Sequence, residues 1–579
     1  MTGAAASSPS DLRSAAWLSA PGKAGSIVRT HLFQAGLAAE DLVGKPVVGI
    51  LSTWSEATPC NAGLRQLADR VARGVLAAGG VPLETPVMSL SEPLMRPTTM
   101  LYRNLLSIEV EEVARANPFD ALVLLGGCDK TVPGLLMGAA SVDLPSVVVT
   151  TGPMLSGSVC GRPAGSGTDL WRVLEERRAG LADDSDVATV ERGLSRSAGH
   201  CMTMGTASTM ACLTEVLGMQ LPGGAAAVAV GADRSRLAAA SGRLAVTMAQ
   251  NGGPRPSALL TREAFENALI TLAAIGGSTN AVLHLLALAG RVGVPLDLDD
   301  VDRLARDVPV LLDVEPSGTG LMADVEAAGG VPALLGRLLP LLHAEARTVT
   351  GATLAEVAAA ASLHDEGVIR PLSRPVAPAG GLAVVRGNLA PGGAVIKVAS
   401  ATPALLQHTG PAWVFDRVED YLAAAADPAN DPPEDVVVVV RGAGPRGWPG
   451  MPEIGNLPIP VRLLEKGVRD VVRICDGRMS GTAYGTVVLH VAPESAAGGP
   501  LGLVRNGDLI SLDLAGRRLD LLVAEEELGA RREASPSVPA STERGWTGLH
   551  RRHVLQADRG ADLDFLVGAS GSAVPRAPF

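Results

Sequence analysis

The sequence predicts an α/β protein in two parts: an N-terminal α/β/α sandwich around a mostly parallel sheet over residues 1–370, and a C-terminal β-rich, barrel-like domain over 371–579. Three observations support this prediction. Hydrophobic residues make up 47% of the chain, enough for a large core. Short apolar runs alternate with helical patterns in the first part, whereas strands dominate the second. Between the two, residues 371–393 are rich in proline and glycine.

The first part begins with alternating strands and helices. Its expected elements, in order, are a strand over Val47–Ser52, a helix over 61–78, a strand over Ala121–Leu125, a helix containing Leu135–Ala140, and a strand over Ser146–Thr150. The first helix places Leu64, Val71 and Val75 on one face and ends at two glycines. Because strand–helix–strand connections are right-handed, this order predicts a parallel sheet covered by helices on both faces.

The second part is predicted to be mainly β-structure. Its expected strands are Val436–Val440, Asp470–Ile474, Thr486–Val491, Leu509–Leu514 and Leu519–Val523, with a few short helical stretches between them. Several short strands separated by turns are typical of a barrel or a sandwich.

Composition and charge exclude several classes of function. A formal net charge of -11 argues against nucleic acid or an anionic membrane as the main partner, since both attract basic surfaces. No apolar run is long enough for a transmembrane helix, and the N-terminal segment lacks the basic and apolar regions of a secretory signal. Six cysteines are too few for a disulfide scaffold in 579 residues. We therefore expect a cytoplasmic protein with a small-molecule partner.

Three cysteines are candidate ligands of a metal group. Cys60 precedes a predicted helix, Cys128 follows a predicted strand and two glycines, and Cys201 precedes the helical run 207–218. Open α/β sheets bind ligands where strands end, and a thiolate near a helix N-terminus has a lowered pKa. The three cysteines are nevertheless far apart in sequence and form no C-x-x-C pair, so the spacing alone gives no metal signal and favours three small buried thiols.

Five polar residues in predicted loops are further candidates. Asp129 and Lys130 directly follow the second of these cysteines on a glycine-hinged turn, and Glu92 and Glu453 lie in loops rich in proline and glycine. Each fits either a functional cluster or a solvated surface charge. Ser480, between a predicted strand and a glycine, fits either an exposed base or nucleophile or an ordinary turn serine. The sequence lacks G-x-S-x-G at this serine, a P-loop, and G-x-G-x-x-G after a strand.

Long segments, spread in order over nearly the whole chain, carry a family resemblance. They are T-W-S-E-A-T-P-C-N (53–61), R-P-T-T-M-L-Y-R-N (96–104), G-G-C-D-K-T-V-P-G-L-L-M-G-A-A-S (126–141), G-H-C-M-T-M-G-T-A-S-T-M-A-C (199–212), G-G-S-T-N-A-V-L-H-L (276–285), G-N-L-A-P-G-G-A-V-I-K (387–397), P-G-M-P-E (449–453) and R-M-S-G-T-A-Y-G-T-V-V-L-H-V (478–491). Together they resemble the dihydroxy-acid and sugar-acid dehydratase family.

The resemblance implies a site with two metal groups. A 2Fe–2S cluster with one iron open to substrate would be bound by Cys60, Cys128 and Cys201. Mg²⁺, which prefers oxygen ligands, would be bound by Glu92, Asp129, Glu453 and a carbamylated Lys130. Ser480 would be the base that removes the C2 proton. The residues expected to contact the substrate are Ser278, Thr279, Thr482 and His553.

The implied activity is dehydration of a 2,3-dihydroxy carboxylate to a 2-keto-3-deoxy acid. Mg²⁺ would chelate the carboxylate and the 2-hydroxyl while cluster iron takes the 3-hydroxyl. Segments 89–104, 126–133 and 544–566 look more like the sugar-acid branch, so an aldonate is the expected substrate. The alternatives are the dihydroxy-acid dehydratase of branched-chain amino-acid synthesis and, more remotely, an iron–sulfur regulatory RNA-binding protein or a zinc protein. The resemblance also implies a homodimer or homotetramer.

Two positions depart from the family pattern. Cys475 stands where relatives commonly have serine, and Ala323, within M-A-D, stands where an acid is expected. Neither is an expected ligand, so neither changes the expected activity.

Overall fold

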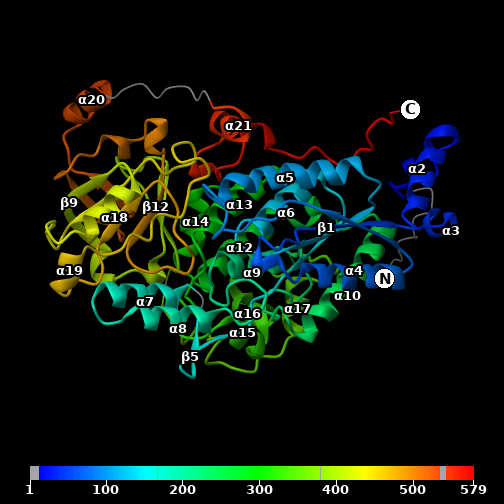
Figure 1. Cartoon of the computed structure of the whole chain (residues 1–579), viewed down its shortest axis with the longest axis horizontal. Coiled ribbons are helices and arrows are strands. Elements are labelled where there is room, and N and C mark those ends of the chain that lie inside the picture. Colours follow the sequence, from blue (N-terminus) through cyan, green and yellow to red (C-terminus); the bar gives the residue numbers. More distant parts are fainter. Residues whose placement is uncertain (1–11, 166, 379, 535–542, 579) are drawn as a thin grey trace.

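The computed structural model describes residues 12–165, 167–378, 380–534 and 543–578. Residues 1–11, part of the segment inspected for a secretory signal, lie outside the described residues. Among the helices that are described, none is both long and apolar enough to span a membrane. Figure 1 shows an elongated molecule with a barrel-like sheet at one end, a smaller sheet toward the other end, and helices between them.

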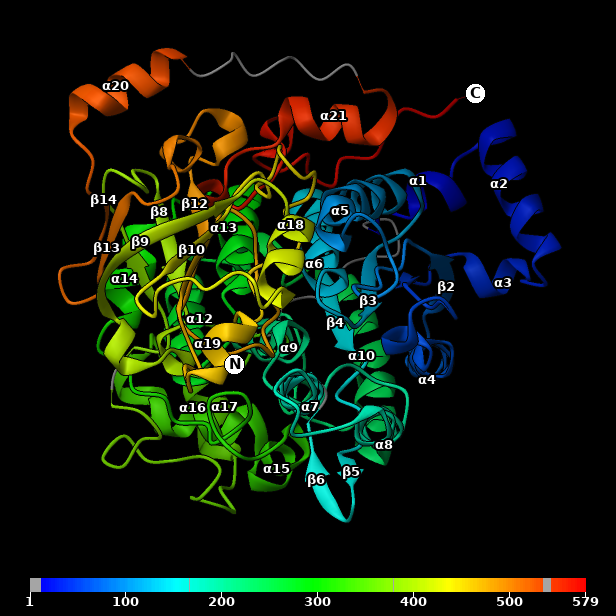
Figure 2. The ribbon, with the colours of Figure 1, turned by 60° about the vertical axis from the view of Figure 1, so that its left-hand side comes forward.

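The N-terminal sheet is parallel throughout, as predicted. It consists of β1 (Val47–Ser52), β2 (Val81–Pro86), β3 (Ala121–Gly126) and β4 (Ser146–Thr150), in the order β2-β1-β3-β4. β1, β3 and β4 are wholly buried, which explains their uninterrupted apolar sequences. Figure 2 shows the sheet between two helical layers, which are α4 (Leu64–Ala77) with α10 (Ala232–Asn251) and α6 (Thr131–Val142) with α5 (Thr99–Ala116).

Beyond β4 the strand–helix alternation expected up to residue 370 does not continue. Apart from the hairpin β5 (Gly157–Val159) and β6 (Arg162–Ala164), the regular elements described between β4 and residue 370 are helices. Besides α10, they are α7 (Thr168–Arg178), α8 (Asp184–Leu194), α9 (Thr206–Val216), α11 (Pro256–Leu259), α12 (Arg262–Ala274), α13 (Asn280–Val292), α14 (Leu298–Ala305), α15 (Met322–Ala328), α16 (Gly330–Leu338), α17 (Leu354–Ala360) and the short 3-10 helix Leu339–Leu341. α9, which is buried all round, corresponds to the helical run predicted over 207–218.

The C-terminal part forms the expected barrel-like sheet. Its strands are β7 (Ala383–Val385), β8 (Gly393–Ile396), β9 (Gln407–Phe415), β10 (Val437–Val440), β11 (Val472–Cys475), β12 (Val487–Ala492), β13 (Leu509–Asp513) and β14 (Arg518–Leu521), in the order β14-β13-β9-β10-β11-β12-β8-β7. β9 to β12 run parallel and the outer strands antiparallel. A bridge from Arg386, next to β7, to Arg518 of β14 joins the two edges. The outer helices are α18 (Val418–Ala426), α19 (Val461–Glu465) and α20 (Glu525–Ala534).

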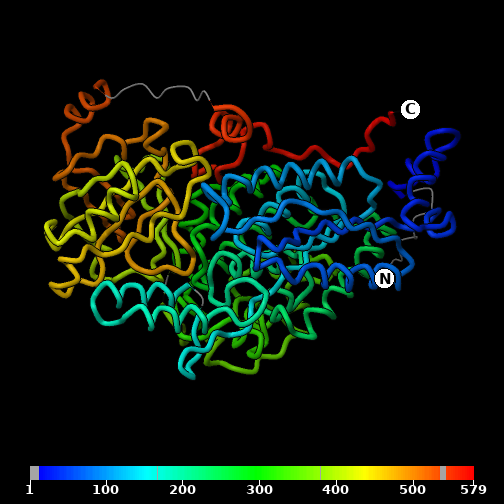
Figure 3. Tube along the Cα trace, in the orientation of Figure 1, coloured from blue at the N-terminus to red at the C-terminus, as the bar shows by residue number. Residues whose placement is uncertain are grey.

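The two chain ends lie against the N-terminal part. The first helices are α1 (Ala15–Leu18), α2 (Gly22–Gln34) and α3 (Ala39–Leu42), and the last is α21 (Gly545–His553). Figure 3 traces the C-terminal segment from the barrel back across the molecule toward the N-terminal helices. Arg291 of α13 and Asp562, both buried, form an ion pair at 2.7 Å, and Arg13 Nε donates to the Ser572 carbonyl at 3.0 Å. The first contact fastens the segment to α13, and the second fastens it to the N-terminal stretch before α1.

Candidate functional site

Most of the candidate residues follow the carboxyl ends of strands in both sheets, whereas Cys201 lies between α8 and α9. Cys60 lies between β1 and α4, Glu92 follows β2, and Cys128–Lys130 connect β3 to α6. From the barrel, Glu453 lies between β10 and β11, and Ser480 lies between β11 and β12. Because the carboxyl ends of parallel strands meet at one edge of a sheet, residues that are distant in sequence converge there.

The three cysteines predicted as ligands lie together. The Cys60 thiol is hydrogen-bonded to Cys128, and this bond, burial, and the neighbouring Cys128, Cys201 and Asp129 raise the pKa of Cys60 well above its ordinary value. Cys128 has a left-handed backbone with φ of 69°, which costs a non-glycine residue about 1–2 kcal/mol. Such backbone conformations persist where the surrounding structure holds the residue in place, and they cluster at functional sites.

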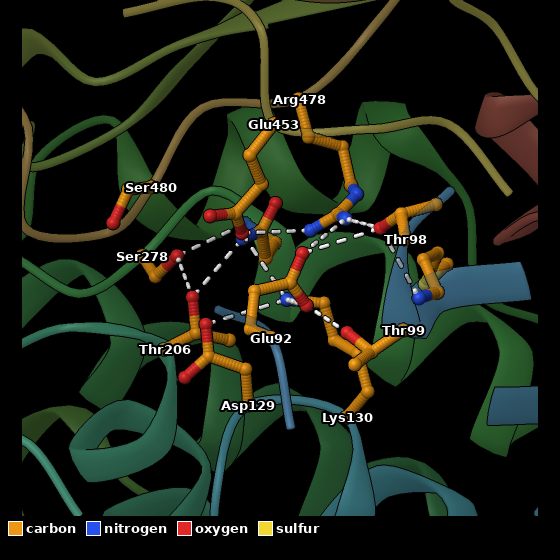
Figure 4. Close-up of polar contacts among 12 residues, drawn as sticks. Glu92, Thr98, Thr99, Asp129, Lys130, Thr206, Ser278, Glu453, Arg478 and Ser480 are labelled. Atoms are coloured by element: carbon orange, nitrogen blue, oxygen red, sulfur yellow. Dashed lines mark hydrogen bonds and ion pairs between the residues drawn. The ribbon is translucent and has the colours of Figure 1, made fainter. Parts of the chain in front are cut away.

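Three predicted acids surround Lys130. Its Nζ lies 3.3 Å from Glu92 Oε2, 3.4 Å from Asp129 Oδ2 and 3.1 Å from Glu453 Oε1 (Figure 4). One ligand oxygen from each acid lies within 4.8 Å of the others. Although burial alone would lower the pKa of Lys130, the three carboxylates raise it. The ammonium of this fully buried side chain therefore supplies a positive charge at the centre of the three carboxylates.

Arg478 supplies a second buried positive charge to the acidic cluster. It donates from Nη1 to Glu453 Oε1 at 2.8 Å, and its Nη2 lies 3.4 Å from Glu92 Oε1. Against the effect of burial, Lys130 and Arg478 together lower the pKa of Glu453 to about 2. Burial instead raises the pKa of Asp129 to about 6, despite the opposing Lys130. Glu92 and Glu453 thus contact Arg478 as well as Lys130.

Arg478 and the neutral side chains that support the acids were not predicted from the sequence. Asn280 Nδ2 donates to Glu453 Oε1 at 2.7 Å and to the Met479 carbonyl at 3.3 Å. Thr98 Oγ1 donates to Glu92 Oε1 at 3.2 Å, and the neighbouring Thr99 hydroxyl also donates to Glu92. Their places within the matched segments 96–104, 276–285 and 478–491 were the signal available in the sequence.

The Ser480 loop packs beside the same cluster. Figure 4 shows Ser480 near Ser278, and a Cβ on Gly481, the next residue in the chain, would lie 2.8 Å from Ser278 Oγ. Ser278 and Thr279 are buried at the start of α13, and Ser278 Oγ lies 2.9 Å from Thr206 Oγ1. Ser480 Oγ lies 3.0 Å from Thr482 Oγ1. Three of the four expected substrate contacts therefore lie beside or adjoin the acidic cluster.

His553 lies apart from this cluster. It ends α21, where its Nδ1 is 3.0 Å from Asp564 Oδ1 and its ring meets Phe565 edge-on at 5.2 Å. Its side chain is 37% exposed, and none of its contacts among the described residues reaches the acids or the thiols. The structure does not bring His553 together with the other expected substrate contacts.

Cys475, the thiol that departs from the family pattern, is a core residue. It is 1% exposed and packs in an apolar cluster with Met479, Ala483, Val487 and Leu489. Burial raises its pKa, so it stays a neutral thiol. It packs against residues on both sides of Ser480 in the chain, and it is not among the groups that shift the pKa of Cys60.

Lys397 is a buried cation that the sequence did not single out. Its Nζ donates to the Gly481 carbonyl at 3.3 Å, and no acidic side chain in the described chain forms an ion pair with it. Burial lowers the pKa of Lys397 to about 7. The residue therefore anchors the loop next to Ser480 without a compensating charge.

Comparison with known proteins identifies the family. Residues 45–357 match the N-terminal domain, and residues 367–561 the C-terminal domain, of the dihydroxy-acid/6-phosphogluconate dehydratases. The chain belongs to this family. It is accordingly a dehydratase, which is a hydro-lyase.

Alignments with individual relatives span almost the whole of this chain and of each relative. The L-arabonate dehydratase of Azospirillum brasilense is 51% identical over 97% of this chain and 98% of its own. The 6-deoxy-6-sulfo-D-gluconate dehydratase of Pseudomonas putida is 47% identical over 98% of both chains. The dihydroxy-acid dehydratase of Halothermothrix orenii is 38% identical over 93% of this chain and 97% of its own. The higher identity to the two sugar-acid enzymes confirms the expected branch.

Proposed function

We propose that this dehydratase converts an aldonate, with hydroxyls on C2 and C3, into the 2-keto-3-deoxy acid. The proposal rests on residues Cys128–Lys130, which join two groups of side chains. Cys128 belongs to the group of three thiols, and the next residue, Asp129, belongs to the cluster of three acids around Lys130. Thiolates suit iron–sulfur groups and carboxylates suit Mg²⁺. Two such sites side by side fit a substrate that offers a carboxylate and two neighbouring hydroxyls.

Cys60, Cys128 and Cys201 fit a 2Fe–2S cluster. Cysteine thiolates are the usual ligands of such clusters, and these thiols are close enough that each disfavours ionisation of Cys60. The positive charge of iron would reverse that effect. Three thiolates for four terminal positions would leave one position for the substrate.

Glu92, Asp129, Glu453 and Lys130 fit a Mg²⁺ site. Carbamylation of Lys130 would join its neutral Nζ to the carbon of CO₂ with loss of a proton, giving a carboxylate-like oxygen donor. The three acids would then lack their central ammonium, and a divalent cation would replace that charge. When bound, Mg²⁺ would stabilise negative charge on the substrate carboxylate and 2-hydroxyl, and the cluster would supply a Lewis acid for the 3-hydroxyl.

Ser480 takes the C2 proton in this proposal. The C2–H bond breaks, the proton joins the Ser480 alkoxide, and the electron pair forms the C2–C3 double bond as the C3–O bond breaks and the 3-hydroxyl leaves as hydroxide. Return of the proton from Ser480 to this hydroxide gives water and restores the alkoxide. The resulting enol tautomerises to the 2-keto acid. Serine's ordinary pKa is too high for this role, so donors to Ser480 Oγ must stabilise the alkoxide. The Thr482 hydroxyl at 3.0 Å and its backbone N–H at 3.4 Å are two such groups.

A second candidate substrate is the branched-chain 2,3-dihydroxy acid. It is supported by the 38% identity to a dihydroxy-acid dehydratase, but identity to sugar-acid enzymes reaches 51%. The two substrates share the carboxylate and both reacting hydroxyls. They differ in the distal chain, which is hydroxylated in an aldonate and a short branched alkyl group in the other.

The deciding experiment compares both substrate classes in the same protein. The dehydratase is prepared anaerobically with Mg²⁺ and incubated with a panel of aldonates and with 2,3-dihydroxy-isovalerate, and 2-keto acid is measured. We expect a higher kcat/KM for at least one aldonate. A higher kcat/KM for 2,3-dihydroxy-isovalerate would overturn the substrate proposal, and colourless protein containing zinc would overturn the iron–sulfur proposal.

The role of Ser480 needs a separate variant. Ser480→Ala should keep the reddish-brown colour and lose turnover, because the metal ligands remain while the base is gone. Turnover at the wild-type rate in Ser480→Ala would remove Ser480 from this role.

A further inference from the structure

Helix α7 lays one face on the loop that carries Ser480. In Figure 1 the helix runs beneath the barrel. The α7 residues that bond to the barrel are spaced three or four residues apart, so they lie on one face of the helix. Thr168 Oγ1 donates to the Thr482 carbonyl at 3.3 Å, Trp171 Nε1 to Thr482 Oγ1 at 3.1 Å, Tyr484 OH to Glu175 Oε2 at 3.1 Å, and Arg178 Nη2 to the Ile459 carbonyl at 3.0 Å. Two of these four bonds end on Thr482.

Thr482 is enclosed by two glycines as well as by these bonds. A Cβ on Gly167, whose φ is 86°, would lie 2.4 Å from Thr482 Oγ1. A Cβ on Gly205 would lie 2.9 Å from Thr482 Cγ2. The absence of side chains at both positions lets the starts of α7 and α9 approach the threonine closely. The Thr482 side chain is therefore held in one orientation, with its hydroxyl between Trp171 and Ser480.

The Trp171 indole determines which hydrogen bond the Thr482 hydroxyl accepts and which it can donate. An indole N–H can only donate, so Thr482 Oγ1 accepts from Trp171. When Ser480 is an alkoxide it has no proton, and the Thr482 hydroxyl must donate across the 3.0 Å to Ser480 Oγ. Hydrogen bonds in such a chain polarise one another, so donation by the indole strengthens donation by the threonine.

We infer that Trp171 is a positioning residue for the proton transfer, because its indole N–H holds the Thr482 hydroxyl as a donor to the Ser480 alkoxide. The inference rests on the proposed role of Ser480 as the base. It gives α7, which carries none of the expected ligands, a defined part in the reaction.

The first test removes the indole N–H and keeps an aromatic ring. In Trp171→Phe, which loses this hydrogen bond, kcat should fall roughly tenfold, equivalent to about 1.4 kcal/mol in the barrier. KM for the aldonate and the iron content should stay unchanged, since Trp171 is neither an expected metal ligand nor an expected substrate contact and its indole N–H is bonded to Thr482. Tyr484→Phe is the matched control: it deletes another hydrogen bond on the same face of α7 without involving the Thr482 hydroxyl. Its kcat should stay close to the wild-type value.

The second test is a double-mutant cycle. In a Thr482→Val background there is no hydroxyl to orient, so adding Trp171→Phe should cause no further loss of kcat. A wild-type kcat in Trp171→Phe, equal losses in Trp171→Phe and Tyr484→Phe, or additive losses in the cycle would each overturn the inference. Activity retained in Ser480→Ala would instead overturn the proposed base itself, so the two failures are distinguishable.

Discussion

Replacing Lys397 by methionine should change how the stability of the protein depends on pH. Lys397 is fully buried, and burial lowers its pKa from 10.5 to about 7. Methionine is a flexible, apolar side chain of similar length, so Lys397→Met removes the titration while filling most of the space. The variant also loses the hydrogen bond to the Gly481 carbonyl, which is worth about 1 kcal/mol.

The size of the effect follows from the two pKa values of Lys397. In the unfolded chain the lysine keeps its proton up to about pH 10.5, whereas in the folded protein it loses the proton near pH 7. Between these values the unfolded state binds more protons, so this group makes the protein more stable as pH rises. Below pH 7 the burial penalty is fully present. At about 1.4 kcal/mol per tenfold change in proton affinity, the penalty is at most about 5 kcal/mol.

The free energy of unfolding of the wild type and of Lys397→Met can be measured by urea unfolding, monitored by circular dichroism, from about pH 7 to about pH 10. Groups common to both proteins cancel when the two are compared at each pH. We expect Lys397→Met to be the more stable protein near pH 7, with an advantage that shrinks as pH rises. Parallel pH dependences would refute the conclusion that Lys397 is buried without a compensating acid.

Three further substitutions test the assignments around the site. Glu453→Gln should raise the Mg²⁺ concentration needed for half-maximal turnover by at least about tenfold and leave the visible absorbance intact; an unchanged requirement would exclude Glu453 as a ligand. Cys475→Ser should keep absorbance and turnover but lower the free energy of unfolding by about 1–3 kcal/mol, because it buries a hydroxyl among apolar side chains; lost absorbance would instead make Cys475 an iron ligand. His553→Ala should leave kcat and KM unchanged in the aldonate assay, since its contacts are Asp564 and Phe565; a raised KM would return His553 to the substrate site.

The buried strands were the part of the fold most directly predictable from sequence. β1 and β4 have the predicted bounds, because each is apolar along most of its length and flanked by polar or turn residues. β2 and β9 were not predicted. β2 is an edge strand with two prolines, and β9 contains an internal glycine and proline. β9 exists because its first half pairs with β13 and its second half with β10, and such long-range pairing leaves no local pattern.

The site was predictable only as far as the family resemblance extended. Asp129 and Lys130 were singled out because they adjoin Cys128 within a long matched segment, although each alone fits a surface charge. Trp171 lies outside every matched segment, and its bond to Thr482 joins residues 311 positions apart. Lys397 ends a matched segment, but nothing in its sequence neighbourhood indicates that the barrel buries it without an acidic partner.

The most direct test of the central claim, that Cys60, Cys128 and Cys201 jointly hold an iron–sulfur cluster, is the iron and acid-labile sulfide content of anaerobically purified protein. The set comprises the wild type, each single Cys→Ser variant of the three, and Cys212→Ser, whose thiol is buried in the core of α9, as the control. We predict equal amounts of iron and sulfide in the wild type and in Cys212→Ser, and loss of both when any one of the three is replaced. A colourless, iron-free wild type, or full iron in all three variants, would contradict the account.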